Sequence, residues 1–237
     1  MSPPDSENPA LGSSASAFKL HVGLFGGTFN PIHYGHLTVA RQTQKALGLD
    51  RILFIPTGDP PHKPEKDLAS AKDRYEMVRL AITSESGFAI SDVETKREGK
   101  SYSIDTVRQL RQENGADVHL SFLIGLDAFL DVPTWREPDA ILKLCSFVVL
   151  NRPGTSFQAL TRLTSLRSLP LQSLADLDAG RISKLEIPLG SQRLICLRLP
   201  PSEISASDIR QKIRQGLSVA NLLPPSVESY IIQHHLY

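Results

Sequence analysis

The stretch Leu24-Phe25-Gly26-Gly27-Thr28-Phe29-Asn30-Pro31-Ile32-His33-Tyr34-Gly35-His36-Leu37 decides how this chain folds. Just before it, apolar residues alternate with other types over residues 20–24, which is typical of a strand. After it, the spacing is helical, at Leu37, Ala40, Gln44 and Leu47. Gly26 and Gly27 therefore lie on a turn that leads from a strand into a helix.

This turn has the features of a phosphate-binding site. Glycines without Cβ let a polyanion approach the backbone, and the start of a helix offers unpaired N–H groups and the positive end of its dipole. His33 and His36 lie at the start of the helix and are expected to project toward the same anion. We interpret them as donors placed where negative charge develops; the alternative is that both only pack or cap the helix.

Other ligand-binding patterns do not fit these residues. The dinucleotide fingerprint G-x-G-x-x-G is absent because the next glycine after Gly27 is Gly35, and no loop ends in G-K-[ST]. A metal site on the histidine pair would need a third ligand and the spacing H-E-x-x-H, which is missing here. These patterns argue against a hydride-transfer enzyme, a P-loop enzyme and metal ligation by the pair.

Two motifs of the chain resemble those of one superfamily. The run from Gly26 to His36 resembles the signature of the nucleotidyltransferases related to class I aminoacyl-tRNA synthetases. The second mark of that superfamily, I-S-x-[ST]-x-x-R near the C-terminus, stands here as Ile204-Ser205-Ala206-Ser207-Asp208-Ile209-Arg210. Two separate motifs in the right order are far more specific than either alone.

Length and charge describe an ordinary soluble globular protein. With 237 residues, 41% of them hydrophobic, the chain can bury a sizeable core, and its net charge of +1 gives no broad field to attract nucleic acid or a membrane. No apolar run reaches membrane-spanning length, and Cys145 and Cys196 lie in apolar segments, as expected for reduced core residues of a cytoplasmic protein. We expect a disordered tail over residues 1–18 and one domain over residues 19–237.

Strands and helices alternate from residue 19 onward, which predicts an α/β fold. We expect a Rossmann-like, doubly wound parallel sheet with helices on both faces. The expected strands after the first are 51–55, 88–90, 118–124, 147–150 and 194–199, and the expected helices are 74–82, 104–110, 140–144 and two that start near Ala206 and Pro225. Residues 204–237 form a C-terminal helical region that carries the second motif, while the Leu- and Ser-rich residues 154–190 are expected to form a helix or a variable surface segment.

Polar residues follow the predicted strands, where parallel sheets bind their ligands. After the motif at residues 26–36 they are Pro56 to Lys63, Gly125 with Asp127, Asn151 with Arg152, and Ser202 to Arg210. We expect them to converge on one edge of the sheet. Lys63 is suited to reach a phosphate, or is a solvated loop lysine. Asp127 can accept from a ribose hydroxyl, cap a short helix at residues 128–130, or do both.

The second motif predicts another anion site. Ser205 to Asp208 resembles a capping box, with Ser205 as the cap and Asp208 reaching back. Arg210 lies near the positive end of the helix that starts there, and an anion bound between them would resolve this electrostatic conflict. The alternative is an exposed arginine that pairs with Asp208 or Glu203.

Two aromatic features concern a second substrate. Trp135 lies in the proline-stiffened run Pro133 to Arg136, and Ser101-Tyr102-Ser103 opens the helix at 104–110. We interpret Trp135 as a face on which a flat ring stacks; the alternative is that it belongs to the core. Helix-start amides around Tyr102 and Ser103 could then bind a small carboxylate on that ring.

These residues narrow the resemblance to one family, the bacterial-type nicotinate-nucleotide adenylyltransferases. The segments that resemble it are Pro61-His62-Lys63, Gly99 to Ser103, Ile124 to Asp127, Pro133 to Trp135 and Leu222-Leu223-Pro224. The resemblance implies transfer of the AMP moiety of ATP to nicotinate mononucleotide, giving deamido-NAD and pyrophosphate in NAD biosynthesis. The family usually carries Asp where this chain has Asn30, and commonly Thr where it has Ser103.

The resemblance also implies roles for single residues. The implied catalytic residues are His33, His36 and Arg210, with His36 stabilising the α-phosphoryl centre. The implied ATP-binding residues are Gly26, Gly27, Thr28, Phe29, Lys63, Gly125, Asp127, Ser205 and Ser207. The implied substrate-binding residues are Asn30, Ser101, Tyr102, Ser103 and Trp135. Mg²⁺ is expected to ride mainly on the ATP phosphates and water, because no dedicated carboxylate cage is visible.

Rival interpretations stay open. A same-fold adenylyltransferase could use nicotinamide mononucleotide, phosphopantetheine or a polyol phosphate as acceptor, although Trp135 and Tyr102 favour a pyridine ring. A non-catalytic nucleotide sensor is a second class, against which the intact His33, His36 and Arg210 speak. A nucleic-acid-binding module lacks the basic patches it would need. The sequence leaves open whether the chain forms a homo-oligomer and whether it prefers the acid or the amide mononucleotide.

Overall fold

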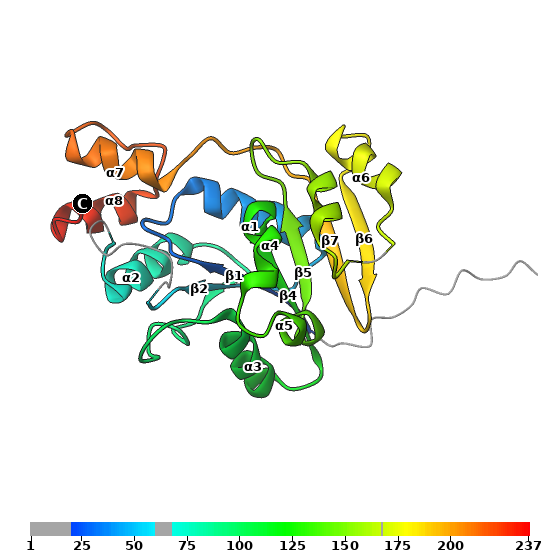
Figure 1. The fold of residues 1–237 in the computed structure, drawn as a ribbon. Coiled ribbons are helices and arrows are strands. Elements are labelled where there is room, and N and C mark those ends of the chain that lie inside the picture. The colour runs from blue at the N-terminus through cyan, green and yellow to red at the C-terminus, as the bar shows by residue number, and fades with distance from the viewer. Residues whose placement is uncertain (1–19, 60–67, 167) are drawn as a thin grey trace, which may run out of the picture.

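The computed structural model describes residues 20–59, 68–166 and 168–237, and centres them on a seven-stranded sheet of order β3-β2-β1-β4-β5-β7-β6 (Figure 1). The strands are β1 (Leu20–Gly27), β2 (Arg51–Pro56), β3 (Phe88–Ile90), β4 (Val118–Gly125), β5 (Ser146–Leu150), β6 (Lys184–Leu189) and β7 (Gln192–Leu197). The helices are α1 (Tyr34–Leu47), α2 (Ala71–Ile82), α3 (Ser103–Asn114), α4 (Leu126–Leu130), α5 (Pro138–Leu144), α6 (Leu171–Asp178), α7 (Ala206–Arg214) and α8 (Pro225–Gln233), with 3₁₀ helices η2 (Val132–Thr134) and η3 (Phe157–Arg162). The predicted tail at residues 1–18 and the predicted phosphate ligand Lys63 lie outside the described residues.

The α/β fold and the predicted strands and helices are confirmed, but the sheet is not wholly parallel. β1 to β5 and β7 pair in parallel, whereas β6 runs antiparallel to β7 at the edge of the sheet. The two strands form a hairpin in which Leu189 pairs with Gln192, and Gly190 turns the chain with a φ of +60°. A hairpin with such a tight turn needs no crossover helix. β6 was therefore not predicted, because the prediction relied on the alternation of strands and helices.

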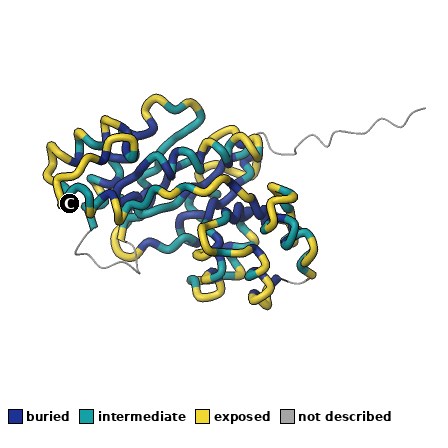
Figure 2. The backbone as a smooth tube through the Cα atoms, turned by 90° about the horizontal axis from the view of Figure 1, so that it is seen from above, coloured by how far each residue is buried: buried dark blue, intermediate teal, exposed yellow. Residues whose placement is uncertain are grey.

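Helices cover both faces of the sheet, as predicted. Alternate strand residues point to opposite faces: Val22 and Leu24 of β1 belong to a core cluster that includes residues of α3, α4, α5 and α6, while Phe25 belongs to one that includes residues of α1, α2, α7 and α8. Buried stretches consequently run through the strands and the inner sides of the helices (Figure 2). Gly23 of β1 has no room for a side chain, because a Cβ there would lie 2.7 Å from the Ile52 side chain.

Residues 154–190 contribute to the core and do not form one helix. Leu160 lies in η3, Leu163 and Leu166 follow it, and all three are buried. α6 and β6 complete the segment. The alternative of a variable surface segment therefore does not describe these leucines.

The chain reverses its direction of winding next to β1. From β1 it crosses to β2 and β3 on one side, and it then returns to β4 and β5 on the other. The carboxyl ends of β1 and β4, which carry Gly27 and Gly125, flank this switch point, where open α/β sheets bind their ligands. α8 comes back beside α2 (Figure 1), and Tyr230 of α8 donates a hydrogen bond to Asp73 of α2 (2.9 Å). Within the described ranges, none of the helices has the length and apolar character that a bilayer crossing requires.

Candidate active site

A cavity of about 590 Å³ opens at the switch point, and most of the predicted site residues line it. From the predicted set it is lined by Gly26, Gly27, Thr28, His33, His36, Ser101, Tyr102, Ser103, Gly125 and Trp135. An adjoining cavity of about 500 Å³ shares Gly26, Gly27, Thr28 and His36 and adds Phe29, Asn30, Ser207 and Arg210. We call the two together the cleft. The predicted convergence on one edge of the sheet is therefore seen for these residues.

His33 and His36 form a stacked pair at the start of α1. His33 is the N-cap residue, and the two ring centroids lie 3.7 Å apart at an interplanar angle of 29°. The backbone N–H of His33 donates to Nδ1 of His36 (3.3 Å). A ring nitrogen that accepts carries no proton, so neutral His36 keeps its proton on Nε2 as a donor. The capping alternative thus holds for the position of His33, but both rings also line the cleft.

Burial sets the charge of His33. The residue is 6% exposed. Burial first, and the nearby Arg152 second, lower the pKa of His33 to about 4. The ring is therefore neutral at neutral pH and acts there as a hydrogen-bonding group, not as a cation.

Two features of the turn fix the pair in place. A Cβ on Gly35 would lie 2.9 Å from Nδ1 of His33 and 2.7 Å from the Ser202 hydroxyl, so glycine leaves room for the ring between α1 and the segment after β7. Phe29 is 2% exposed, and its ring meets His36 edge-on at 5.1 Å. Its side chain supports His36 from within the core.

Asn30 joins three segments that are distant in sequence. Its Oδ1 accepts hydrogen bonds from the Ala69 N–H (3.0 Å) and the Tyr237 hydroxyl (2.7 Å). Its carbonyl oxygen accepts from Nη1 of Arg210 (2.9 Å). Burial raises the pKa of Tyr237, which keeps that hydroxyl protonated as a donor. The amide oxygen of Asn30 serves these donors without the negative charge that the family's usual Asp would bring.

The second motif reaches the cleft through Ser207 and Arg210. Arg210 donates to Asn30 and, at 3.4 Å, to the Ser207 hydroxyl, so neither Asp208 nor Glu203 is the partner that holds it. The predicted capping box is wrong. Ser205 has the extended backbone of a cap, but its side chain makes no capping hydrogen bond to α7. Unlike Ser207, Ser205 is not among the residues that line the cleft.

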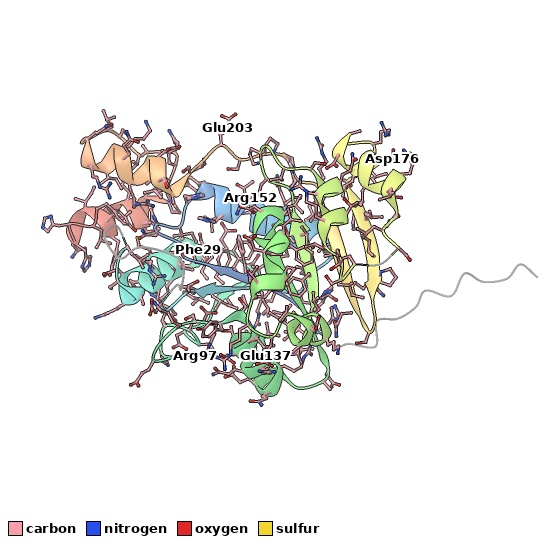
Figure 3. The ribbon with its side chains drawn as sticks, in the orientation of Figure 1. Phe29, Arg97, Glu137, Arg152, Asp176 and Glu203 are labelled. Atoms are coloured by element: carbon pink, nitrogen blue, oxygen red, sulfur yellow. The ribbon has the colours of Figure 1, made fainter. Side chains whose placement is uncertain are left out.

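Arg152 lines the cleft, and Asp127 lies beside it without being among the lining residues. α4 starts at Leu126 after Gly125 as N-cap, so Asp127 belongs to its first turn and does not cap it, which corrects that alternative. Its exposed carboxylate lies 3.8 Å from Nε of Arg152. Arg152 lines both parts of the cleft and lies close to α1 and α4 (Figure 3). The sequence offered a signal for it, because it closely follows a predicted strand.

Tyr102 and Trp135 lie at the other end of the cleft. Tyr102 is the N-cap of α3, with Ser103 as the first helical residue and the buried Ser101 before it. Trp135 is half-buried and meets Phe122 edge-on at 6.2 Å, while it also lines the cavity. Trp135 therefore packs on the core and also lines the cleft, and the stacking of a flat ring on it stays a prediction.

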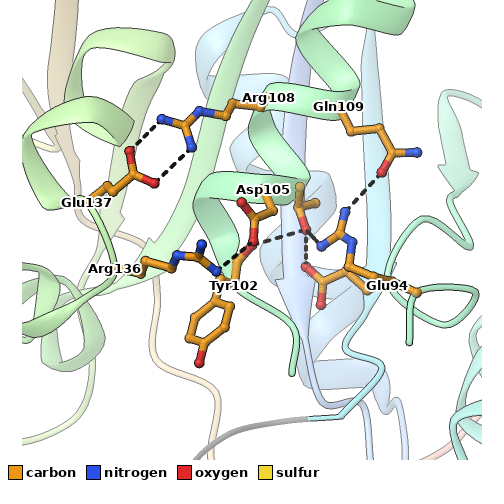
Figure 4. Close-up of polar contacts among 9 residues, drawn as sticks. Glu94, Tyr102, Asp105, Arg108, Gln109, Arg136 and Glu137 are labelled. Atoms are coloured by element: carbon orange, nitrogen blue, oxygen red, sulfur yellow. Dashed lines mark hydrogen bonds and ion pairs between the residues drawn. The ribbon is translucent and has the colours of Figure 1, made fainter. Parts of the chain in front are cut away.

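Two further buried charged residues were not predicted. Glu94 lines the cavity and accepts from the Thr106 hydroxyl (2.8 Å), and burial raises its pKa (Figure 4). No motif or spacing marks it. Arg74 is 1% exposed and donates to three carbonyl oxygens, those of Thr28 (2.9 Å), Gly58 (2.8 Å) and Ala69 (2.9 Å). The sequence feature that could have revealed it is the position of an arginine on the apolar face of an amphipathic helix.

The remaining predictions concern thiols and metals. Cys145 and Cys196 are free and buried, and burial raises the pKa of each to about 12, which suits inert core thiols. Within residues 20–59, 68–166 and 168–237, no cluster of three or more His, Cys, Asp and Glu side chains is placed to hold a metal ion.

Comparison with known proteins shows what the chain is similar to. Residues 24–212 match the family described as Cytidylyltransferase-like. A relative from Pelobacter propionicus, named probable nicotinate-nucleotide adenylyltransferase, is 39% identical over 218 residues, which are 92% of this chain and 98% of the relative. A protein of the same name from Synechococcus sp. is 38% identical over 237 residues, covering 100% and 99% of the two chains.

A solved structure supports the fold. The Plasmodium falciparum nicotinic acid mononucleotide adenylyltransferase complexed with NaAD superimposes with a TM-score of 0.67 at 17% identity, over 92% of this chain and 97% of that one. At this identity the match shows a common fold. The full-length relatives and the family match carry the assignment further: the chain belongs to the cytidylyltransferase-like family and, within it, to the nicotinate-nucleotide adenylyltransferases.

Proposed function

We propose that the cleft of this nicotinate-nucleotide adenylyltransferase holds ATP on the two motifs and the mononucleotide on the aromatic end, so that the 5′-phosphate attacks the α-phosphorus in line. The observation that carries the proposal is the continuity of the cleft from Arg210 through His36 to Trp135. Attack forms the new phosphate–phosphate bond as the bond to pyrophosphate breaks. No covalent enzyme intermediate is needed, because positioning and charge stabilisation suffice for this class of transfer.

The first motif stabilises the α-phosphoryl centre in this scheme. In it, His36 donates from Nε2 to the developing charge, because its Nδ1 accepts from the His33 backbone N–H. His33 contributes a neutral ring, and the glycines of the turn let the phosphates approach the amides at the start of α1. Preorganised donors of this kind cost no reorganisation during the reaction.

Arginines and the ATP-bound metal neutralise the remaining negative charge of the phosphates. Arg210, held by Asn30 and Ser207, and Arg152, which lines the cleft, supply positive charge, and we extend this role to Lys63. Mg²⁺ fits as a companion of the ATP phosphates, since the cleft presents N–H donors and Asp127 is already beside Arg152. When bound, Mg²⁺ neutralises phosphate charge. The ribose of ATP is assigned to Gly125 and Asp127.

The mononucleotide ring stacks on Trp135 near Tyr102 in this proposal. Ser101, Tyr102 and Ser103 place the N-terminal amides of α3 at the same end of the cavity. An apolar face beside hydrogen-bond donors suits a flat ring with one polar substituent.

Pyrophosphate release tests the function directly. MgATP is supplied with nicotinate mononucleotide or with nicotinamide mononucleotide at equal concentration, and initial rates are compared. We expect strong preference for the acid. Comparable rates would indicate a dual-specificity enzyme. No release with either would contradict the proposal and direct attention to another phosphate acceptor or to a nucleotide sensor.

A further inference from the structure

We propose that the guanidinium of Arg136 binds the carboxylate of the nicotinate ring and so makes the enzyme select the acid mononucleotide over the amide. The proposal rests on the proposed function and deepens it at the ring end of the cleft. It assigns selectivity to a charged side chain, in addition to the helix-start amides of α3.

Arg136 is placed where the ring substituent would lie. It directly follows Trp135 and lines the same cavity as Trp135 and Tyr102. Its guanidinium carbon lies 5.0 Å from the centroid of the Tyr102 ring, a distance at which a cation is attracted by an aromatic face. Tyr102 thus holds the guanidinium in place (Figure 4), next in sequence to Trp135, on which the pyridine ring is expected to stack.

The guanidinium of Arg136 has N–H donors available for a ligand. Its contact with a carboxylate is a single one, from Nη1 to Oδ2 of Asp105 at 3.5 Å, and the side chain is 54% exposed. The neighbouring Arg108 differs, because it donates two hydrogen bonds to Glu137, at 2.9 and 2.6 Å (Figure 4). Arginine carries five N–H donors in a planar fork that matches a carboxylate, so Arg136 can bind one while it keeps its contact with Asp105.

Charge at this end of the cavity distinguishes the two substrates. A carboxylate is negative and accepts hydrogen bonds only, whereas a carboxamide is neutral and presents two donors as well. The other arginine that lines the cavity, Arg152, lies beside Asp127 and His33. The carboxylate of Glu94 accepts a hydrogen bond from the Thr106 hydroxyl, and burial raises the pKa of Glu94. Among the residues that the structure describes, Arg136 is therefore the arginine that places positive charge at the ring end of the cavity.

The test compares both mononucleotides in matched variants of the full chain. We expect Arg136→Gln to lower kcat/KM for nicotinate mononucleotide by about tenfold, mainly through KM, which is the low end for a charge-assisted hydrogen bond because the site is half-exposed. The same change leaves kcat/KM for nicotinamide mononucleotide unaltered, so the selectivity ratio falls. Arg136→Lys, which keeps the charge, recovers part of the ratio. Arg108→Gln is the control and leaves the ratio unchanged.

Equal losses with both substrates would overturn the proposal, because Arg136 would then only support Tyr102. A second measurement makes this independent of turnover: nicotinate mononucleotide is titrated into the wild-type protein and the Arg136→Gln variant without ATP. We expect about tenfold weaker binding to the variant, and equal affinities would overturn the proposal. Absence of pyrophosphate release by the wild-type protein, with the binding difference intact, would instead contradict the transfer reaction.

Discussion

Two histidines of one motif receive different properties from their surroundings. His33 is buried and its pKa is lowered, while His36 has its Nδ1 fixed by a backbone N–H and its ring supported by Phe29. The motif itself predicts that both rings meet a phosphate. The difference between them depends on burial and on Arg152, which become visible only when the strands are assembled.

Removal of the His36 ring should slow the reaction without unfolding the protein. We expect His36→Ala to lower kcat by ~10²–10³, the usual loss when one preorganised donor is removed from a transition state. Steady-state pyrophosphate release measures it. His234→Ala is the control, because that ring is exposed on the segment after α8 and stacks on Tyr230. Unchanged turnover would exclude His36 from the mechanism.

The lowered pKa of His33 predicts a pH dependence of stability. Its pKa is about 4 in the folded protein against 6.5 when unperturbed, so the unfolded chain binds the extra proton first. The contribution to stability is present above pH 6.5 and is lost as the pH falls toward 4, by up to ~3 kcal/mol. Urea unfolding at pH 7 and pH 4.5 should therefore show a smaller loss for His33→Gln than for the wild type.

His21 and His119, whose pKa values are also lowered mainly by burial, contribute equally to both proteins in that comparison and cancel. Identical pH dependence of the variant and the wild type would contradict the assignment. The absolute stabilities are not compared, because the substitution itself alters packing.

At the scale of elements, the alternation of strand and helix was readable because each strand carries an apolar run bounded by turn residues. Elements that departed from this pattern were missed. β6 alternates Lys184, Glu186 and Pro188 with apolar residues, as edge strands do, and it pairs through a tight turn. Arg74 was missed for a similar reason, because it lies among the apolar residues of its helix. Its guanidinium donates to three backbone carbonyl oxygens from segments that no local sequence pattern brings together.

That arginine should be a strong structural cross-link between α2 and the loops of the cleft. We expect Arg74→Met to lower the free energy of unfolding by ~2–4 kcal/mol, since the carbonyls of Thr28, Gly58 and Ala69 lose their donor in a buried place. Arg79→Met on the same helix, where Arg79 pairs with Glu76 at the surface, should change it far less. Urea denaturation compares the two, and similar losses would contradict the role of Arg74.

At the scale of the whole molecule, the cleft is closed by residues from both ends of the sequence. The two motifs and their order indicated that residues 26–36 and 204–210 meet. The link through Tyr237 was not predictable, because a tyrosine carries no motif and the contact depends on how α8 packs on α2.

Loss of the Tyr237 hydroxyl should weaken this closure. We expect Tyr237→Phe to reduce the free energy of unfolding by about 1 kcal/mol, the worth of one hydrogen bond, and to raise KM for ATP more than KM for the mononucleotide, because Asn30 also holds Arg210. A double-mutant cycle with Asn30→Ala provides the control, since the effect of Tyr237→Phe should largely vanish when Asn30 is absent. Independent, additive effects would show that the hydroxyl acts elsewhere.

The contact between Asn30 and Tyr237 spans 207 positions of the chain, and this has a consequence for the order of events during synthesis. A ribosome releases the first motif early, and the strands up to β7 can then pair as they emerge. Arg210 arrives later, and the hydroxyl that completes the hydrogen bonds of Asn30 comes only with residue 237. The strands of the sheet are therefore made before the arginine and the hydroxyl that contact Asn30, and we expect the sheet to form before this part of the cleft is complete.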